Sequence, residues 1–167
     1  MKLSKPTILL ATLLLLLSAI TSCRSVIDIA PLSGLNQHYL DQVPQGVSIV
    51  YVNKKNVSTD SIFEEVFKVL LYRGHRISKE DKARLYITTE GKDVGEWTMQ
   101  RMAILIVETQ NGADIKISTE WKPRYQDSED SLIDWGVAKW GTYKGSVAFA
   151  ESLVIANEIE NGIISYE

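Results

Sequence analysis

The feature that most constrains this chain is a pair of extended segments joined at Asn111-Gly112. This dipeptide favours a tight β-hairpin because both of its residues tolerate positive φ. Residues 97–108 precede it and have an apolar centre, and apolar and polar side chains alternate through residues 115–121 beyond it. Successive side chains of a strand point to opposite faces. The sequence therefore predicts two antiparallel strands with one buried and one wet face.

Two more strands and two helices are predicted outside this hairpin. A run of β-branched residues and an alternating run indicate the strands. Two stretches with apolar residues at helical spacing indicate the helices, and a glycine follows each of them. The element order β-α-β-β-β-α predicts an α+β fold, a two-layer sandwich with two helices on one face of a mostly antiparallel sheet of about four strands. The additional strands are expected at residues 47–53 and 83–89, and the helices from Ser58 or Ser61 to Gly74 and from Tyr143 to Asn161.

The N-terminus has the layout of a secretory signal peptide. Lys2 and Lys5 precede an apolar run over residues 8–20, and small residues follow it. A transmembrane helix is the alternative, but polar residues interrupt the run before the roughly 20 apolar residues that a span needs. The sequence Ile20-Thr21-Ser22-Cys23 resembles the lipobox of bacterial lipoprotein precursors. This resemblance implies signal cleavage between Ser22 and Cys23 and a diacylglyceryl group on the Cys23 thiol.

Cys23 is the only cysteine in the 167 residues, so an ordinary disulfide cannot explain it. A stray thiol near a cleavage site is the alternative to an acyl acceptor. The lipoprotein interpretation divides the chain into a signal peptide (1–22), a lipidated N-terminus with a tether (23–46) and a single α+β domain (47–167). Whether the tether is a flexible coil or docks on the domain stays open at this point.

Charge restricts the partners of such a mature protein. Cleavage would leave 16 basic and 21 acidic residues, a net charge of −5. This balance argues against nucleic-acid binding and against electrostatic adhesion to an anionic bilayer, so the N-terminal lipid is the expected membrane contact. Arg24 follows the lipidated cysteine, where an aspartate retains enterobacterial lipoproteins in the inner membrane. For a Gram-negative source the resemblance thus implies an outer-membrane anchor that faces the periplasm.

Motifs for catalysis, cofactors or metals are missing from the sequence. No G-x-S-x-G or H-E-x-x-H motif occurs. His75, beside two arginines at a helix end, is more typical of a solvated histidine than of a base, and His38 falls in the tether. The acidic residues 127–131 suggest calcium, but Leu132 stands where an EF-hand loop beginning at Asp127 needs glycine. We therefore predict no catalytic residue, cofactor or metal site.

Aromatic side chains gather near one predicted loop and form the candidate binding surface. Aromatic residues with a polar group are enriched at protein interfaces, and sugars also stack on exposed rings. The alternative is that the tryptophans fix a long loop to the core. The residues concerned are Trp121, Tyr125, Trp135, Trp140 and Tyr143.

The element order over residues 47–162, with the turn Gly74-His75, resembles small accessory lipoproteins of Gram-negative envelopes. This resemblance implies a non-enzymatic accessory or assembly domain that binds an envelope protein. Binding of glycan, peptidoglycan or lipid through the aromatic loop at residues 121–143 is a second hypothesis. A hydrolase that uses His75 as its base is a third.

Overall fold

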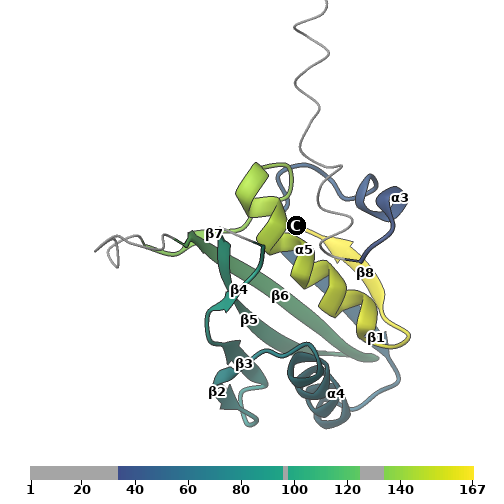
Figure 1. Cartoon of the computed structure of the whole chain (residues 1–167). Coiled ribbons are helices and arrows are strands. Elements are labelled where there is room, and N and C mark those ends of the chain that lie inside the picture. The colour runs from purple at the N-terminus through teal and green to yellow at the C-terminus, as the bar shows by residue number, and fades with distance from the viewer. Residues whose placement is uncertain (1–33, 96–97, 125–133) are drawn as a thin grey trace, which may run out of the picture.

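The computed structural model describes residues 34–95, 98–124 and 134–167 (Figure 1). Within these residues the strands form one sheet in the order β2-β3-β5-β6-β1-β8, and every pairing is antiparallel. Two short strands join it, with β4 paired to β5 and β7 to β6. The strands are β1 (Ile49–Lys55), β2 (Ile77–Asp81), β3 (Tyr86–Thr89), β4 (Lys92–Asp93), β5 (Thr98–Thr109), β6 (Gly112–Pro123), β7 (Gly136–Val137) and β8 (Ile163–Tyr166). The helices are α3 (Gln37–Leu40), α4 (Thr59–Tyr72) and α5 (Tyr143–Glu158).

The predicted hairpin is confirmed, but Gly112 lies at the start of a strand and not in the turn. Strands β5 and β6 pair from Thr98↔Pro123 to Thr109↔Gly112, so the turn residues are Gln110 and Asn111. Gly112 has φ +146° and lies at the start of β6. A Cβ added there would lie 1.9 Å from the carbonyl oxygen of Lys54. Glycine is needed because β1 approaches the backbone closely at this point.

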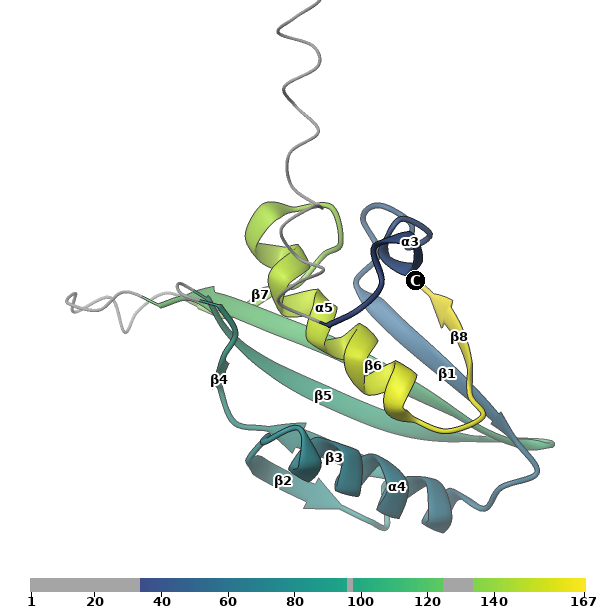
Figure 2. The same ribbon diagram turned by 45° about the vertical axis from the view of Figure 1, so that its right-hand side comes forward.

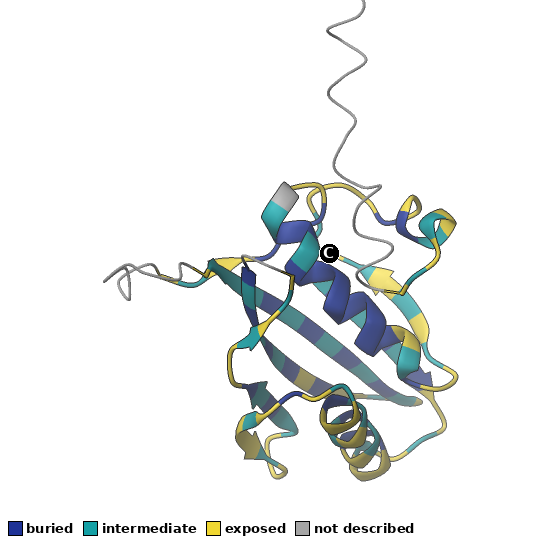
Figure 3. Ribbon diagram, viewed as in Figure 1, coloured by how far each residue is buried: buried dark blue, intermediate teal, exposed yellow. Residues whose placement is uncertain are grey.

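The sheet has one covered face and one open face. Helices α4 and α5 both lie on the covered face (Figures 1 and 2). Burial alternates along β5 and β6, which gives their ribbons the bands of Figure 3. The alternate side chains that point to the helices form the core with them, as one face of a two-layer fold must. Among the fully buried core residues are Val50, Val52, Ile104, Ile115, Ile117, Phe149, Leu153 and Ile155.

The predicted fold class is wrong in its element count. The described residues form eight strands and three helices, where about four strands and two helices were expected. Strand β2 has the sequence ISKED, which is too polar to be recognised by apolar alternation. Its backbone pairs with β3 at an edge of the sheet, where charged residues also hinder aggregation. Strand β8 is a short edge strand of four residues, and β4 and β7 have two residues each.

One predicted strand and both predicted helices have limits that the structure defines more closely. The strand expected at 83–89 begins at Tyr86, because residues 82–85 form a turn in which Leu85 has φ +53°. Ser58 is the N-cap of α4, since its side chain accepts a hydrogen bond from the Ser61 amide. Helix α5 ends at Glu158, three residues before the expected limit, and a reversal leads into β8.

Part of the predicted tether docks on the domain. Leu40 and Val43 are buried in the same core cluster as α5. The amide of Gly46 donates to the carbonyl of Trp140 at 2.8 Å, and the Trp140 amide donates to the carbonyl of Val47 at 2.9 Å. Docking has a physical cause, because every residue of α5 from 148 to 156 is buried and a helix buried on all sides needs cover beyond the sheet. The signal peptide and Cys23 lie outside the described residues.

Replacing Leu40 by alanine tests whether this segment belongs to the folded unit. Leu40→Ala should lower the free energy of unfolding by about 2–5 kcal/mol, the usual cost of emptying a buried leucine site. Urea unfolding followed by circular dichroism measures the change. Leu71→Ala is the matched control, because Leu71 is half exposed on α4 and its truncation should cost under about 1 kcal/mol. Equal effects of the two substitutions would show that residues 34–46 are not part of the cooperative unit.

Candidate functional site

The open face of the sheet contains a hollow of about 510 Å³, which we call the trough. Its floor follows from cross-strand register, because Thr88 pairs with Ala103 and Ala103 with Ser118. These three small side chains lie in one row across β3, β5 and β6. The next row on one side contains Tyr86 and the next on the other side contains Arg101 and Glu120, so larger side chains form two walls. Ser78 and Val137 complete the outline of the trough.

One wall of the trough is an ion pair under an aromatic ring. The Arg101 Nε donates to Glu120 Oε2 at 2.6 Å, and both side chains are partly exposed. The guanidinium carbon lies 4.5 Å from the ring centroid of Trp135, and the Lys122 ammonium lies 5.1 Å from it. Cations over an indole face are attracted by the ring quadrupole. Trp135 thus holds the Arg101 side chain in place while Glu120 compensates its charge.

The hydroxyl groups of the trough are already ordered. Ser78 Oγ and Thr88 Oγ1 are 2.8 Å apart, and the Ser118 hydroxyl donates to the carbonyl of Ala103 at 3.1 Å. A hydroxyl has one donor and two acceptor positions, so each of these groups retains hydrogen-bonding capacity. The trough therefore presents fixed polar groups on a rigid antiparallel floor.

The predicted aromatic surface is divided by the fold. Trp140 is buried in the core, 6.1 Å from the ring of Phe149, which agrees with the alternative that it fixes the loop. Trp121 is half-buried and packs against the core cluster. Trp135 lies on the open face, against Gly91 and the cations described above. Tyr125 lies outside the described residues, and so does the side chain of Tyr143, the first residue of α5.

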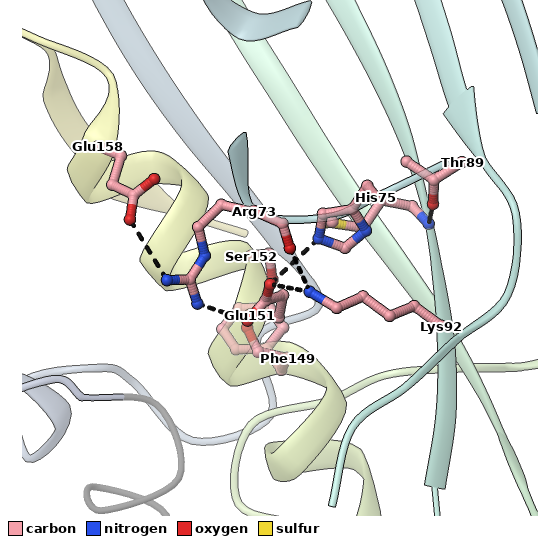
Figure 4. A network of polar contacts seen from close by, with 9 residues as sticks. Arg73, His75, Thr89, Lys92, Phe149, Glu151, Ser152 and Glu158 are labelled. Atoms are coloured by element: carbon pink, nitrogen blue, oxygen red, sulfur yellow. Dashed lines mark hydrogen bonds and ion pairs between the residues drawn. The ribbon is translucent and has the colours of Figure 1, made fainter. Parts of the chain in front are cut away.

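A second polar cluster is buried between α4, β4 and α5, and its centre is Glu151. Figure 4 shows three side chains that converge on this carboxylate. His75 Nε2 lies 3.1 Å and Lys92 Nζ 3.0 Å from Oε1, and an Arg73 terminal nitrogen lies 3.2 Å from Oε2. Lys92 also donates to the Arg73 carbonyl at 2.7 Å, so this cation ties the end of α4 to α5. The cluster joins three elements of the covered face.

The cations around Glu151 stabilise its ionised form. Burial raises the pKa of this carboxyl, but hydrogen bonds from His75 and Lys92 and the charges of Lys92 and Arg73 outweigh burial and lower the pKa to about 2. The side chain of His75 is fully buried, so this histidine is neither solvated as predicted nor open to a substrate. The geometry of the cluster is that of a structural ion network.

The remaining sequence candidates take no part in either cluster. His38 lies on α3 near Gln42, and the acidic residues 127–131 lie outside the described residues. Within residues 34–95, 98–124 and 134–167, no group of three His, Cys, Asp or Glu side chains is arranged to hold a metal. No helix in that part of the chain is both long and apolar enough to cross a bilayer.

No protein-family model matches the chain, and no curated protein sequence is significantly similar to it. The trough is therefore interpreted from its own residues. Sequence reasoning missed Arg101, Glu120 and the small-residue floor. The alternation through β6 places Glu120 on the wet face, but only the observed register sets it opposite Arg101.

Glu151→Gln should remove the central charge of the buried cluster. Because the pKa of Glu151 is lower in the folded protein than its ordinary value of 4.5, its stabilisation is complete above about pH 4.5 and disappears as the pH falls toward 2. At pH 7 the variant should lose on the order of 3 kcal/mol in the free energy of unfolding, because Lys92 loses its ion pair and Arg73 keeps only its longer contact of 3.5 Å with Glu158. This loss should shrink steadily between pH 5 and pH 2.

Urea unfolding of both proteins at several pH values measures this difference. Glu108→Gln, a change at an exposed position of β5, is the control and should stay within about 0.5 kcal/mol of the wild type at each pH. If the free energies of unfolding of the wild type and Glu151→Gln differ by the same amount at pH 7 and pH 3, the lowered pKa of Glu151 is contradicted.

Proposed function

We propose that this chain is a lipid-anchored lipoprotein of the bacterial cell envelope whose domain binds a protein partner and performs no catalysis. The lipobox sequence that ends at Cys23 supports the anchor, and the net charge of −5 leaves the lipid as its membrane contact. Arg24 after the cysteine supports an outer-membrane position facing the periplasm in a Gram-negative cell. The enclosed His75 supports a non-enzymatic domain, because this side chain cannot reach a substrate.

Docking of the N-terminal segment limits how far such a domain extends from the membrane. Leu35 packs against the core and is twelve positions beyond Cys23. A fully extended chain covers at most about 3.6 Å per residue, so twelve residues span roughly 40 Å. The partner is therefore expected at or close to the membrane that holds the lipid.

The open face of the sheet supports a binding role, and this observation carries the proposal. No element of the described residues covers it, and beyond the trough it exposes Leu105 (38%), Val107 (46%) and Ile163 (61%). Polar and aromatic side chains stand between them, including the hydrogen-bonded pair Asn53 and Asp114 and the ring of Tyr51. We call these six residues the hairpin-end surface. Its mixture of apolar, tyrosine and paired polar groups is typical of non-obligate protein interfaces.

Substituting the lipobox cysteine tests the anchor. In Gram-negative cells that express the full chain, the wild type should incorporate a clickable palmitate analogue, because the lipobox resemblance implies acyl groups on Cys23. Cys23→Ala should remain an unlabelled precursor. Ser25→Ala, a substitution two positions away, is the control and should be labelled like the wild type. Equal labelling of Cys23→Ala and the wild type would refute the lipoprotein assignment.

Photocrosslinking in intact cells tests the partner surface. A benzophenone amino acid at Val107 should give one discrete protein adduct that survives denaturing electrophoresis. The matched position is Leu71, an exposed apolar residue on α4 in the helix layer, where we expect no such adduct. No adduct at Val107, or equal adducts at both positions, would contradict a partner on the hairpin-end surface.

A further inference from the structure

We infer that the trough is a binding site for a neutral, hydroxyl-rich ligand, which in an envelope protein means a segment of glycan. This inference goes beyond the proposed function, because the trough and the hairpin-end surface are adjoining but different parts of the open face. The trough spans the rows of Thr88 and Arg101 and ends at the wall of Tyr86, and the hairpin-end surface begins at Leu105, the cross-strand partner of Tyr86.

The size of the trough suits a small part of a larger ligand. Its volume of about 510 Å³ falls in the range of roughly 300–1,000 Å³ that ligand sites occupy. The hollow exists because Thr88, Ala103 and Ser118 are small, whereas the neighbouring rows contain Tyr86 and Arg101. Its floor consists of hydrogen-bonded strands, so the site is formed before any ligand arrives.

The charges of the trough favour a neutral ligand. Arg101 and Glu120 are the two charged residues of its lining, and they are bonded to each other at 2.6 Å. An anionic ligand would have to compete with Glu120 for the guanidinium, and a cationic ligand would have to compete with Arg101. A guanidinium has five N–H donors and a carboxylate about four acceptor sites, and this bond uses one of each. The Arg101–Glu120 pair therefore offers donors and acceptors with no net charge, and Lys122, which also lies over the Trp135 ring, is outside the lining.

The remaining polar groups match sugar hydroxyls. Ser78, Thr88 and Ser118 contribute hydroxyls that can donate and accept, as the hydroxyls of a sugar do. Tyr86 adds an aromatic wall, and aromatic rings contact the apolar faces of sugar rings. A row of mixed donors and acceptors would be a poor surface for an acyl chain, because desolvating unpaired polar groups is costly.

An extended peptide is a poorer candidate for the trough than a glycan. Peptides that add to sheets do so at an edge, where backbone N–H and C=O groups are unpaired. The floor consists of β3, β5 and β6, and each of these strands is paired on both sides. Their backbone groups are engaged in the ladder, so only side chains are available to a ligand.

Glycan binding by the full-length lipoprotein in detergent micelles tests this inference. The probes are immobilised neutral oligosaccharides, including N-acetylglucosamine and glucose oligomers, together with sialylated and sulfated ones. We expect at least one neutral oligosaccharide to bind and the acidic ones to bind less. Ala103→Leu, which fills the floor, should weaken that binding by roughly tenfold or more, the effect of losing one or two hydrogen bonds. Leu71→Ala, at an exposed position of α4 outside both surfaces, is the control and should bind like the wild type.

Glu120→Gln separates recognition from folding. Glutamine has the shape of glutamate, but it leaves the Arg101 cation uncompensated, so the preference should shift from neutral toward acidic oligosaccharides. Circular dichroism confirms that each variant is folded. Binding to no neutral oligosaccharide, stronger binding to acidic ones by the wild type, or binding that Ala103→Leu does not weaken would each overturn the inference. A Val107 adduct that persists in those cases would leave the proposed protein partner intact.

Discussion

The ladder between β5 and β6 is the interaction on which the rest of the structure depends. It pairs twelve residues of each strand without a register shift. Because side chains alternate along both strands, this single ladder divides the domain into a face covered by the helices and an open face that contains the trough. β1 and β3 extend the sheet on the two sides of the hairpin, and their residues continue the same rows. Both the trough and the hairpin-end surface are consequences of these rows.

The hairpin could be predicted from the sequence because the Asn-Gly dipeptide and the flanking alternation are local signals. Its register could not be predicted from them. A two-residue turn centred on Asn111-Gly112 would place Arg101 opposite Lys122. The observed turn at Gln110 and Asn111 places Arg101 opposite Glu120. The faces are unchanged, because the two registers differ by two residues, but every cross-strand partner is different. In the observed register Gly112 lies where β1 approaches the hairpin, and this tertiary contact cannot be read from the local sequence.

The edge strands escaped prediction for a related reason. β2 and β8 are defined by backbone bonds to a neighbour and not by their own apolar pattern. The core strands and both long helices carry that pattern, so their positions were recognised. The aromatic cluster illustrates the same limit, because Trp135 and Trp140 are five positions apart and yet lie on the open face and in the core. Closeness in sequence did not indicate a common surface.

The N-terminal segment docks on the side of the sheet opposite the open face. Figures 1 and 2 both show residues 34–36 running beside α5, on the covered side of the sheet. The proposed lipid at Cys23 is separated from Leu35 by at most roughly 40 Å of extended chain. Glu151 and its cations fix α5 to α4 and β4 within the same layer. Because the N-terminal segment docks on the side of the helices, it leaves the open face uncovered, and that face contains both the polar trough and the hairpin-end surface.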